Sequence, residues 1–365
     1  MAPLNQRAWV LQERVLSPRI LHFASNQIFW ECQSHSGCES YPLGLPSSME
    51  DGLDVLDRAF SARTLRCLLE KFEVEILTCS SGGDQSVVEN QPGSRAATDM
   101  DGVYRYWDRI VQSYSSCGLT KPGDKLAALS GLAQFVEKRL KVQYLAGIWG
   151  QHLPEQLNWH INPDLKACSR RAPEYRAPSW SWASIDGPIL PRRPVNEGKC
   201  LIKVLGAMIF PTIVGQTGQV KNAYLKLRAS ILQLDGLVLR TGSTLDLISF
   251  DGGRLRYHLT IQPDVSLPLG EVGCNIPLHC GEFEGSLWLM PITQSIPQPW
   301  ITSLVLKRMH GHTFRFQRIG HFEAKDVGVC QMFSSTEVGD HDRRLEIHEL
   351  LMLRSQLSET KQLKL

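Results

Sequence analysis

The 365-residue sequence has no long hydrophobic run, almost no excess charge of either sign and no dense cysteine framework. No apolar run approaches the roughly 20 residues that a membrane helix needs, and no signal peptide opens the chain. The 39 basic and 37 acidic residues leave a net charge of +2, which predicts no general attraction to nucleic acid or anionic lipid. The ten cysteines lie far apart, so we expect no structural disulfide and a cytoplasmic location.

Motifs for cofactor chemistry are also missing. The sequence contains no P-loop, no glycine-rich dinucleotide fingerprint, no nucleophile elbow and no zinc-protease motif. This lack disfavours phosphoryl transfer and cofactor-dependent redox reactions, and we expect no cofactor. Two groups of cysteine and histidine lack the paired spacing and the fourth ligand of a zinc site, so we expect no metal. These groups are Cys32, His35 and Cys38, and Cys274, His279 and Cys280.

Near its start, the chain has a block at residues 5–23 that predicts a helix followed by a strand. Ser17 and Pro18 end the helix, and residues 19–23 are typical of a buried strand. The apolar residues that recur at helical spacing are Trp9, Val10, Val15 and Leu16.

Two later blocks accompany this one. The first comprises residues 107–116 and 119–131, and the second comprises residues 144–149 and 175–184. The three blocks in this order resemble the fungal heterokaryon-incompatibility (HET) domain family, and residues 5–23 resemble the motif that closes that domain. In the family, expression of the domain triggers cell death. The resemblance implies that its amino-terminal part is absent from this chain.

The overall pattern predicts an α+β fold. Residues 1–190 form a mixed α/β, HET-like remnant with a flexible, polar insert at 80–101. Residues 191–335 carry seven short apolar runs separated by turn residues, which predicts an antiparallel β-rich barrel or sandwich. Residues 336–365 are predicted to form a carboxy-terminal helix and tail.

Within the first part, several local elements are expected. Residues 24–32 continue as a strand that forms a hairpin with 19–23. Residues 53–75 carry a helical apolar pattern, another helix begins near Tyr104, and a further helix spans 125–140 with Asp124 as its N-cap.

Tryptophan is the most informative residue type. Five of the nine tryptophans lie between residues 107 and 182, and residues 178–184 alternate indoles with small residues, as in a strand. Either these indoles form an ordinary core, or Trp149, Trp180 and Trp182 wall a pocket for an apolar substrate. Five polar side chains nearby are candidates for catalytic hydrogen bonds to that substrate: Tyr175, Arg176, Ser179, Ser181 and Asp186.

Three functions follow as hypotheses. A cofactor-free, intramolecular 4+2 cycloaddition (Diels–Alder) of a terpenoid needs mainly shape and one hydrogen-bond donor. Short HET-like proteins also resemble Diels–Alder cyclases of sordarin-type diterpene biosynthesis, so we favour a cyclase of fungal secondary metabolism. The alternatives are a HET-type protein of non-self recognition without its effector part, and a non-catalytic binding protein. No motif identifies a protein partner.

Overall fold

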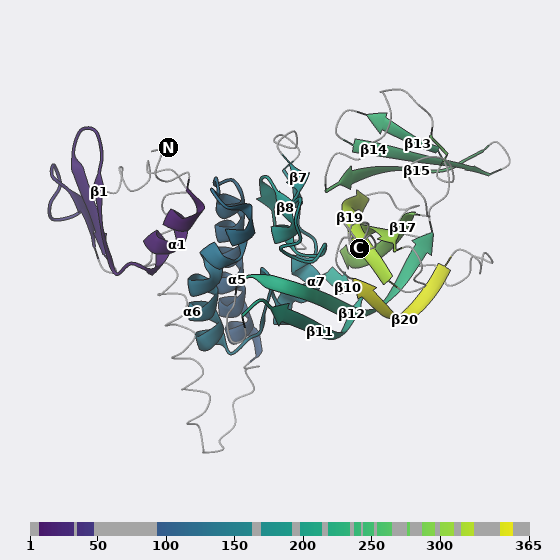
Figure 1. Ribbon diagram of the computed structural model, residues 1–365, viewed down its shortest axis with the longest axis horizontal. Coiled ribbons are helices and arrows are strands. Elements are labelled where there is room, and N and C mark those ends of the chain that lie inside the picture. Colours follow the sequence, from purple (N-terminus) through teal and green to yellow (C-terminus); the bar gives the residue numbers. More distant parts are fainter. Residues whose placement is uncertain are drawn as a thin grey trace, which may run out of the picture. The chain divides into compact units, whose positions relative to one another are not determined.

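The computed structural model describes residues 7–32, 35–46, 93–162, 169–191, 198–213, 218–233, 237–241, 244–251, 254–264, 276–277, 287–295, 300–309, 315–324 and 344–352 (Figure 1). The chain divides into two compact units. The first consists of Met1–Thr120 and Ala128–Val142, and the second consists of Lys121–Ala127 and Gln143–Leu365.

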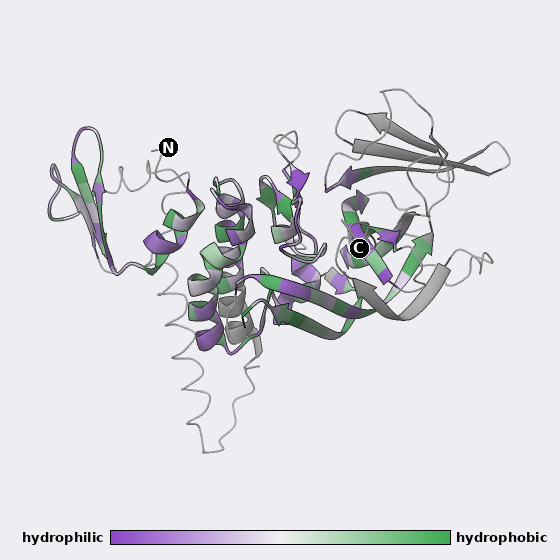
Figure 2. Ribbon diagram, viewed as in Figure 1, coloured by the Kyte–Doolittle hydropathy of each residue, from purple (hydrophilic) through white to green (hydrophobic). Residues whose placement is uncertain are grey.

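The first unit opens with a helix and a small antiparallel sheet. Helix α1 (Ala8–Leu16) ends at Ser17. Strand β1 (Arg19–Phe23) pairs with β2 (Ile28–Cys32), and β3 (Ser36–Cys38) pairs with the other edge of β2. The predicted helix, its end at Ser17 and the hairpin are therefore confirmed. Figure 2 shows apolar stretches along these strands.

The predicted burial of β1 is wrong. Its side chains alternate between exposed and half-buried, and Leu21 and Phe23 are 62% and 78% exposed. The strand lies at the edge of its three-stranded sheet, and the exposed side chains belong to a face that the described part of the chain leaves open. The apolar pattern predicted a strand, but it contained no information about this edge position.

Two longer helices complete the first unit, α5 (Gly93–Ser115) and α6 (Ser130–Leu140), and α1 contacts both. The flexible insert predicted at 80–101 is wrong for residues 93–101, because α5 already begins at Gly93. Residues 80–92, like the helix predicted at 53–75, lie outside the described residues. The predicted aromatic stripe of α5 is buried: it comprises Tyr106, Trp107, Ile110, Val111 and Tyr114.

Helix α6 starts later than predicted. Two 3-10 turns come first, and the α-helix begins only at Ser130, so Asp124 is not its N-cap. The side-chain oxygen of Gln12 in α1 instead accepts hydrogen bonds from the N–H groups of Gly131 and Leu132, at 2.8 and 3.2 Å. The first N–H groups of a helix need acceptors from outside the helix. Here a distant part of the sequence supplies them.

The second unit contains many short elements around buried indoles. The strand predicted at 178–184 is wrong, because Trp182–Ser184 form a 3-10 turn, η6, whose start is capped by the Ser181 hydroxyl. Residues on both sides of the expected alternation are buried. The remaining short elements of the chain are η2 (Pro122–Lys125), η3 (Ala127–Leu129), β4 (Tyr144–Leu145), β5 (Ile148–Trp149), η4 (Gly150–His152), α7 (Leu153–Gln156), β6 (His160–Ile161), β7 (Arg170–Arg171), β8 (Ile185–Asp186) and β9 (Ile189–Leu190).

Among the described residues, the second unit also contains an 11-stranded sheet. The seven strands predicted after residue 190 are all present, whereas β10, β14 and β16 were not predicted. The predicted terminal helix is wrong at Arg344–Met352, which form strand β20: Leu345 and Ile347 alternate with polar residues, and the strand pairs with β12. The strands are β10 (Gly198–Cys200), β11 (Lys203–Pro211), β12 (Val220–Gln233), β13 (Leu237–Thr241), β14 (Thr244–Asp251), β15 (Arg254–Pro263), β16 (Ile276–Pro277), β17 (Leu287–Ser295), β18 (Trp300–Arg308), β19 (Arg315–Ala324) and β20.

Strand pairing in this sheet runs through β12, β17, β18, β19 and β20 and back to β12. The β12–β17 and β19–β20 junctions consist of two residue pairs each, and the β19–β20 pairing is parallel. No regular closed barrel therefore forms among the described strands. The large, mainly antiparallel sheet together with helices confirms the predicted α+β class. Packing also groups residues 143–190 with this sheet.

The pairing of β15 with β19 leads to a test at Gly320. A Cβ there would lie 2.8 Å from the carbonyl oxygen of Gln262 and 3.1 Å from the Cα of Pro263. We expect Gly320→Ala to lower the free energy of unfolding by about 1–3 kcal/mol in urea denaturation, because backbone must move to make room. Gly206→Ala in β11 is the matched control, since a Cβ there meets nothing within 4 Å. Equal losses in both variants would contradict this pairing.

Candidate functional site

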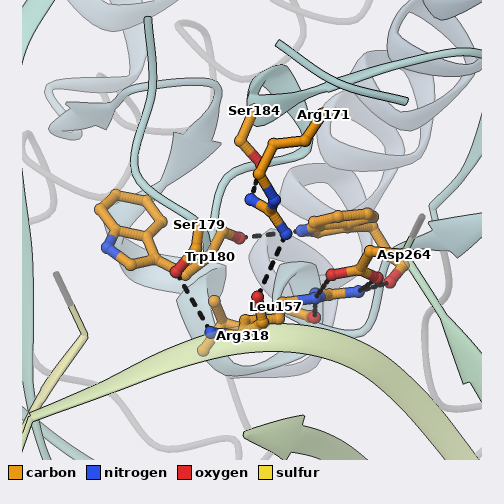
Figure 3. A network of polar contacts seen from close by, with 8 residues as sticks. Leu157, Arg171, Ser179, Trp180, Ser184, Asp264 and Arg318 are labelled. Carbon is orange, nitrogen blue, oxygen red and sulfur yellow. Dashed lines mark hydrogen bonds and ion pairs between the residues drawn. The ribbon is translucent and has the colours of Figure 1, made fainter. Parts of the chain in front are cut away.

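A fully buried ion pair lies at the centre of the second unit. The side chains of Arg318 in β19 and Asp264, which follows β15, are 0% and 1% exposed and meet at 3.0 and 3.1 Å (Figure 3). The Arg318 guanidinium also donates to the carbonyl oxygens of Leu157, at 2.6 Å, and Trp159. Its Cζ lies 3.4 Å from the centroid of the Trp159 ring. Every part of the guanidinium therefore has a partner, as a buried charge requires.

A second arginine extends this network, which we call the Arg318 cluster. Arg171 donates to the carbonyl oxygen of Arg318 at 3.2 Å and approaches the Ser184 hydroxyl at 3.5 Å. The Ser179 hydroxyl accepts the main-chain N–H of Arg318 at 3.2 Å. Burial lowers the pKa of both arginines, and the Asp264 carboxylate opposes that shift. The Asp264 carboxylate thus stabilises the charges of both Arg171 and Arg318. Main-chain carbonyl oxygens, which accept hydrogen bonds from both guanidinium groups, stabilise these charges further.

A second group of charges, the Lys125 cluster, contains Lys125, Arg176 and Asp186. Arg176 donates to the carbonyl oxygens of Ala183, at 2.6 Å, and Pro122, at 3.1 Å. Its third nitrogen lies 2.6 Å from an Asp186 carboxylate oxygen. The guanidinium is 5% exposed and the carboxylate is 24% exposed. Arg176 therefore holds the two ends of the 176–186 segment and η2 together.

Lys125 is a buried amine of the second unit. Its side chain is buried, donates to the carbonyl oxygen of Ile185 and lies 5.7 Å from the centroid of the Trp182 ring. Burial, together with the nearby Arg176 cation, lowers the pKa of Lys125 to about 7, although Asp186 acts in the opposite direction. The amine is consequently poised to lose its proton near neutral pH.

The three predicted pocket indoles are all inside the protein. Trp149 and Trp180 are 0% exposed and Trp182 is 2% exposed. The Trp182 indole N–H donates to the carbonyl oxygen of Gly147 at 2.9 Å. Gly147 has a φ of +105°, and a Cβ there would lie 2.7 Å from the Trp182 nitrogen, so this contact requires glycine. The Trp180 carbonyl oxygen accepts the Trp159 indole N–H at 2.8 Å.

The structure sorts the predicted site residues into different surroundings. Arg176, Asp186 and Trp182 come together around Lys125, whereas Ser179 belongs to the Arg318 cluster. The Ser181 hydroxyl donates to the carbonyl oxygen of Ala146 at 2.5 Å. Trp149 packs on Tyr144 with ring centroids 5.0 Å apart, and Tyr175 is half-buried.

Sequence reasoning missed Lys125, Asp264 and Arg318. One signal was present for Arg318, because it comes two residues after Phe316 and so lies on the same side of the strand as this apolar residue. A charge on an apolar face indicates a buried pair. Nothing in the sequence indicates that Asp264 is its partner.

Other kinds of site are not evident in the described part of the chain. There, no three His, Cys, Asp or Glu side chains gather as metal ligands. The four described cysteines, Cys32, Cys38, Cys117 and Cys200, form no disulfide, while Cys274, His279 and Cys280 lie outside the described residues. None of the described helices is long and apolar enough to cross a membrane.

Comparison with known protein families, curated proteins and solved structures gives no match. The resemblance to HET domains therefore stays a prediction.

The Arg318 cluster predicts a large stability effect. Arg318→Met should lower the free energy of unfolding by about 3–5 kcal/mol, because it leaves the Asp264 carboxylate buried without its cation. The double variant Arg318→Met/Asp264→Leu should recover part of this loss in the same denaturation assay. Arg228→Met, on an exposed position of β12, is the control and should be close to wild type. A double variant less stable than Arg318→Met would contradict the assigned pair.

Lys125 predicts a pH dependence of stability. Its folded pKa of about 7 is below its ordinary value of 10.5, so between these pH values the unfolded chain binds more protons. The free energy of unfolding contributed by this group therefore rises with pH over that window, by at most about 1.4 kcal/mol per pH unit. Denaturation at several pH values should show this slope in wild type and in the exposed control Lys121→Met. The slope should be lost in Lys125→Met, and its persistence there would refute the assignment.

Proposed function

We propose that this chain is a non-catalytic module of HET type that acts by contacting proteins in a non-self recognition response. The observation that carries the proposal is how the polar groups of the 176–186 segment are used. Arg176, Ser181 and Trp182 all donate to main-chain carbonyl oxygens of their own unit. A catalytic donor has to face the atom on which charge develops in the substrate, whereas these donors face the protein backbone.

The β11–β12 ribbon offers a surface for such a contact (Figure 1). Met208 and Phe210 are 45% and 42% exposed, and Tyr224 in β12 lies beside both: its hydroxyl is 3.3 Å from the Met208 sulfur, and its ring centroid is 6.3 Å from that of Phe210. Exposed apolar clusters of this kind mark interaction sites. We call these three residues the ribbon patch.

The charge around the ribbon patch indicates the kind of partner. Residues 203–213 and 218–233 contain no Asp or Glu. Lys203 and Arg228 are exposed and lie opposite each other in the register of the two strands. A protein with an apolar centre and an acidic rim would complement this face.

A growth assay tests the proposal. The chain would be co-expressed in a filamentous fungus with a full-length HET-domain protein from the same genome, and growth arrest would be scored with a viability dye. We expect the chain to shift the onset of arrest, and Phe210→Glu to abolish that shift without changing the melting temperature. Leu43→Glu, at a position 91% exposed in the other unit, is the matched control. No shift by the wild-type chain, or equal effects of both variants, would count against the proposal.

The cyclase is the second candidate, and one observation favours it. The Trp180 indole N–H is fully buried and has no hydrogen-bond partner in the described part of the structure. A buried donor without a partner could polarise a substrate carbonyl. In an intramolecular cycloaddition three π bonds become one π bond and two σ bonds, and no atom is gained or lost, so the reaction needs no cofactor. Enclosure in a folded conformation would supply the rest of the acceleration.

Turnover of a polyunsaturated terpenoid aldehyde, followed by mass spectrometry and NMR, tests this candidate. Trp180→Phe keeps an aromatic ring but removes the N–H, and we expect it to slow product formation by about 100-fold. Trp9→Phe, at an indole 40% exposed in the first unit, is the control and should leave the rate unchanged. Product formed at the same rate and with the same stereochemistry without protein would eliminate the cyclase.

A further inference from the structure

Within the described part of the chain, strand β1 pairs with β2 alone, so its other backbone edge is open there. Its five residues pair with β2 in an unbroken register without a bulge. The N–H of Ala24, which follows β1, donates to the carbonyl oxygen of Gln27 at 3.2 Å. Hydrogen-bonded and non-hydrogen-bonded pairs alternate in an antiparallel ladder, so the N–H and C=O groups of Arg19, Leu21 and Phe23 point away from β2.

The same three residues carry the exposed side chains. The burial of β1 alternates strictly, with Arg19, Leu21 and Phe23 exposed and the residues between them half-buried. Both the outward backbone groups and the exposed apolar side chains therefore belong to the same positions. Edge strands in stable monomers are usually protected by a bulge, a proline or several charges. Within β1 there is no bulge or proline, and Arg19 is the one residue with a permanent charge.

We propose that β1 pairs antiparallel with β1 of a second copy of this chain, with Leu21 on the two-fold axis. The two three-stranded sheets would then form one six-stranded sheet. Leu21 would face the partner's Leu21, and Arg19 would face the partner's Phe23 on the same side of the sheet. The interface would be isologous, since each copy contributes the same five residues.

The residue order of β1 suits this particular register. Arg19 opposite an aromatic ring forms a cation–π contact at both ends of the interface, and no like charges are opposed.

On the other face, Ile20 would lie opposite the partner's His22, whose ring is 3.0 Å from Glu31 of its own chain. Glu31 also pairs with Arg14 at 3.2 Å, and these two contacts lower its pKa although burial alone would raise it. The charges on that face are therefore balanced within each copy.

The contact area of the proposed dimer is small, and this limits its expected affinity. A five-residue edge covers far less surface than the roughly 1,600 Å² of a standard stable interface. We therefore expect a weak dimer that forms as concentration rises. Sedimentation velocity of the full chain from about 1 µM to about 1 mM covers the relevant range of affinity.

One pair of variants tests the surface. Leu21→Lys would place two ammonium groups face to face on the axis and should weaken the dimer at least tenfold. Leu43→Lys introduces the same charge at a residue 91% exposed outside β1, and the dimer should persist. Circular dichroism and the melting temperature verify that both variants are folded. A wild-type chain that stays monomeric throughout, or equal weakening by both variants, would overturn the proposal.

A second pair tests the register. Phe23→Glu removes an exposed ring, so general hydrophobic association would weaken. In the proposed register, however, Glu at position 23 faces the partner's Arg19, and the dimer should be retained. Adding Arg19→Glu to Phe23→Glu opposes like charges at both ends and should abolish the dimer. Loss of the dimer in Phe23→Glu alone would refute this register, as would a dimer that persists in the double variant.

Discussion

The buried pair of Arg318 and Asp264 is the constraint on which the second unit depends. Removing two charges from water is costly, and the cost is offset only when each donor and acceptor is satisfied. Arg318 meets this condition by using groups from separate segments: the Asp264 carboxylate and the carbonyl oxygens of Leu157 and Trp159. The core therefore has one arrangement in which the charge is tolerated, and that arrangement joins β19 to the indole-rich segments.

The two charge clusters together hold the 176–186 segment from two sides. Arg176 and Lys125 bond to the carbonyl oxygens of Ala183 and Ile185, while Arg171 approaches Ser184. A segment held by so many contacts to its backbone is suited to rigidity. The serine, arginine and tryptophan side chains of this segment, although of types common in binding sites, therefore stabilise the fold by hydrogen bonds to the backbone.

Local periodicity predicted much of the secondary structure. The end of α1 at Ser17, the β1–β2 hairpin and the seven strands after residue 190 each have a pattern that lies within a few neighbouring residues. The errors have a different origin. The alternation of Trp180 and Trp182 with small residues indicated a strand with one aromatic and one polar face. In the structure both faces of this segment are buried, and Trp182–Ser184 form a 3-10 turn. The terminal strand β20 was misread as a helix, although Leu345 and Ile347 alternate with polar residues, and its pairing with β12 is a distant contact that the sequence does not show.

The sequence by itself determined the α+β class, the positions of most strands and the concentration of tryptophan between residues 107 and 182, because these depend on residue type and short-range spacing. Only the tertiary structure decided that β1 is an open edge, that Gln12 caps α6 and that Arg318 meets Asp264. It likewise decided that Lys125 is buried against the carbonyl oxygen of Ile185. Each of these depends on which distant groups meet and on how much solvent is excluded between them, and no local pattern encodes either quantity.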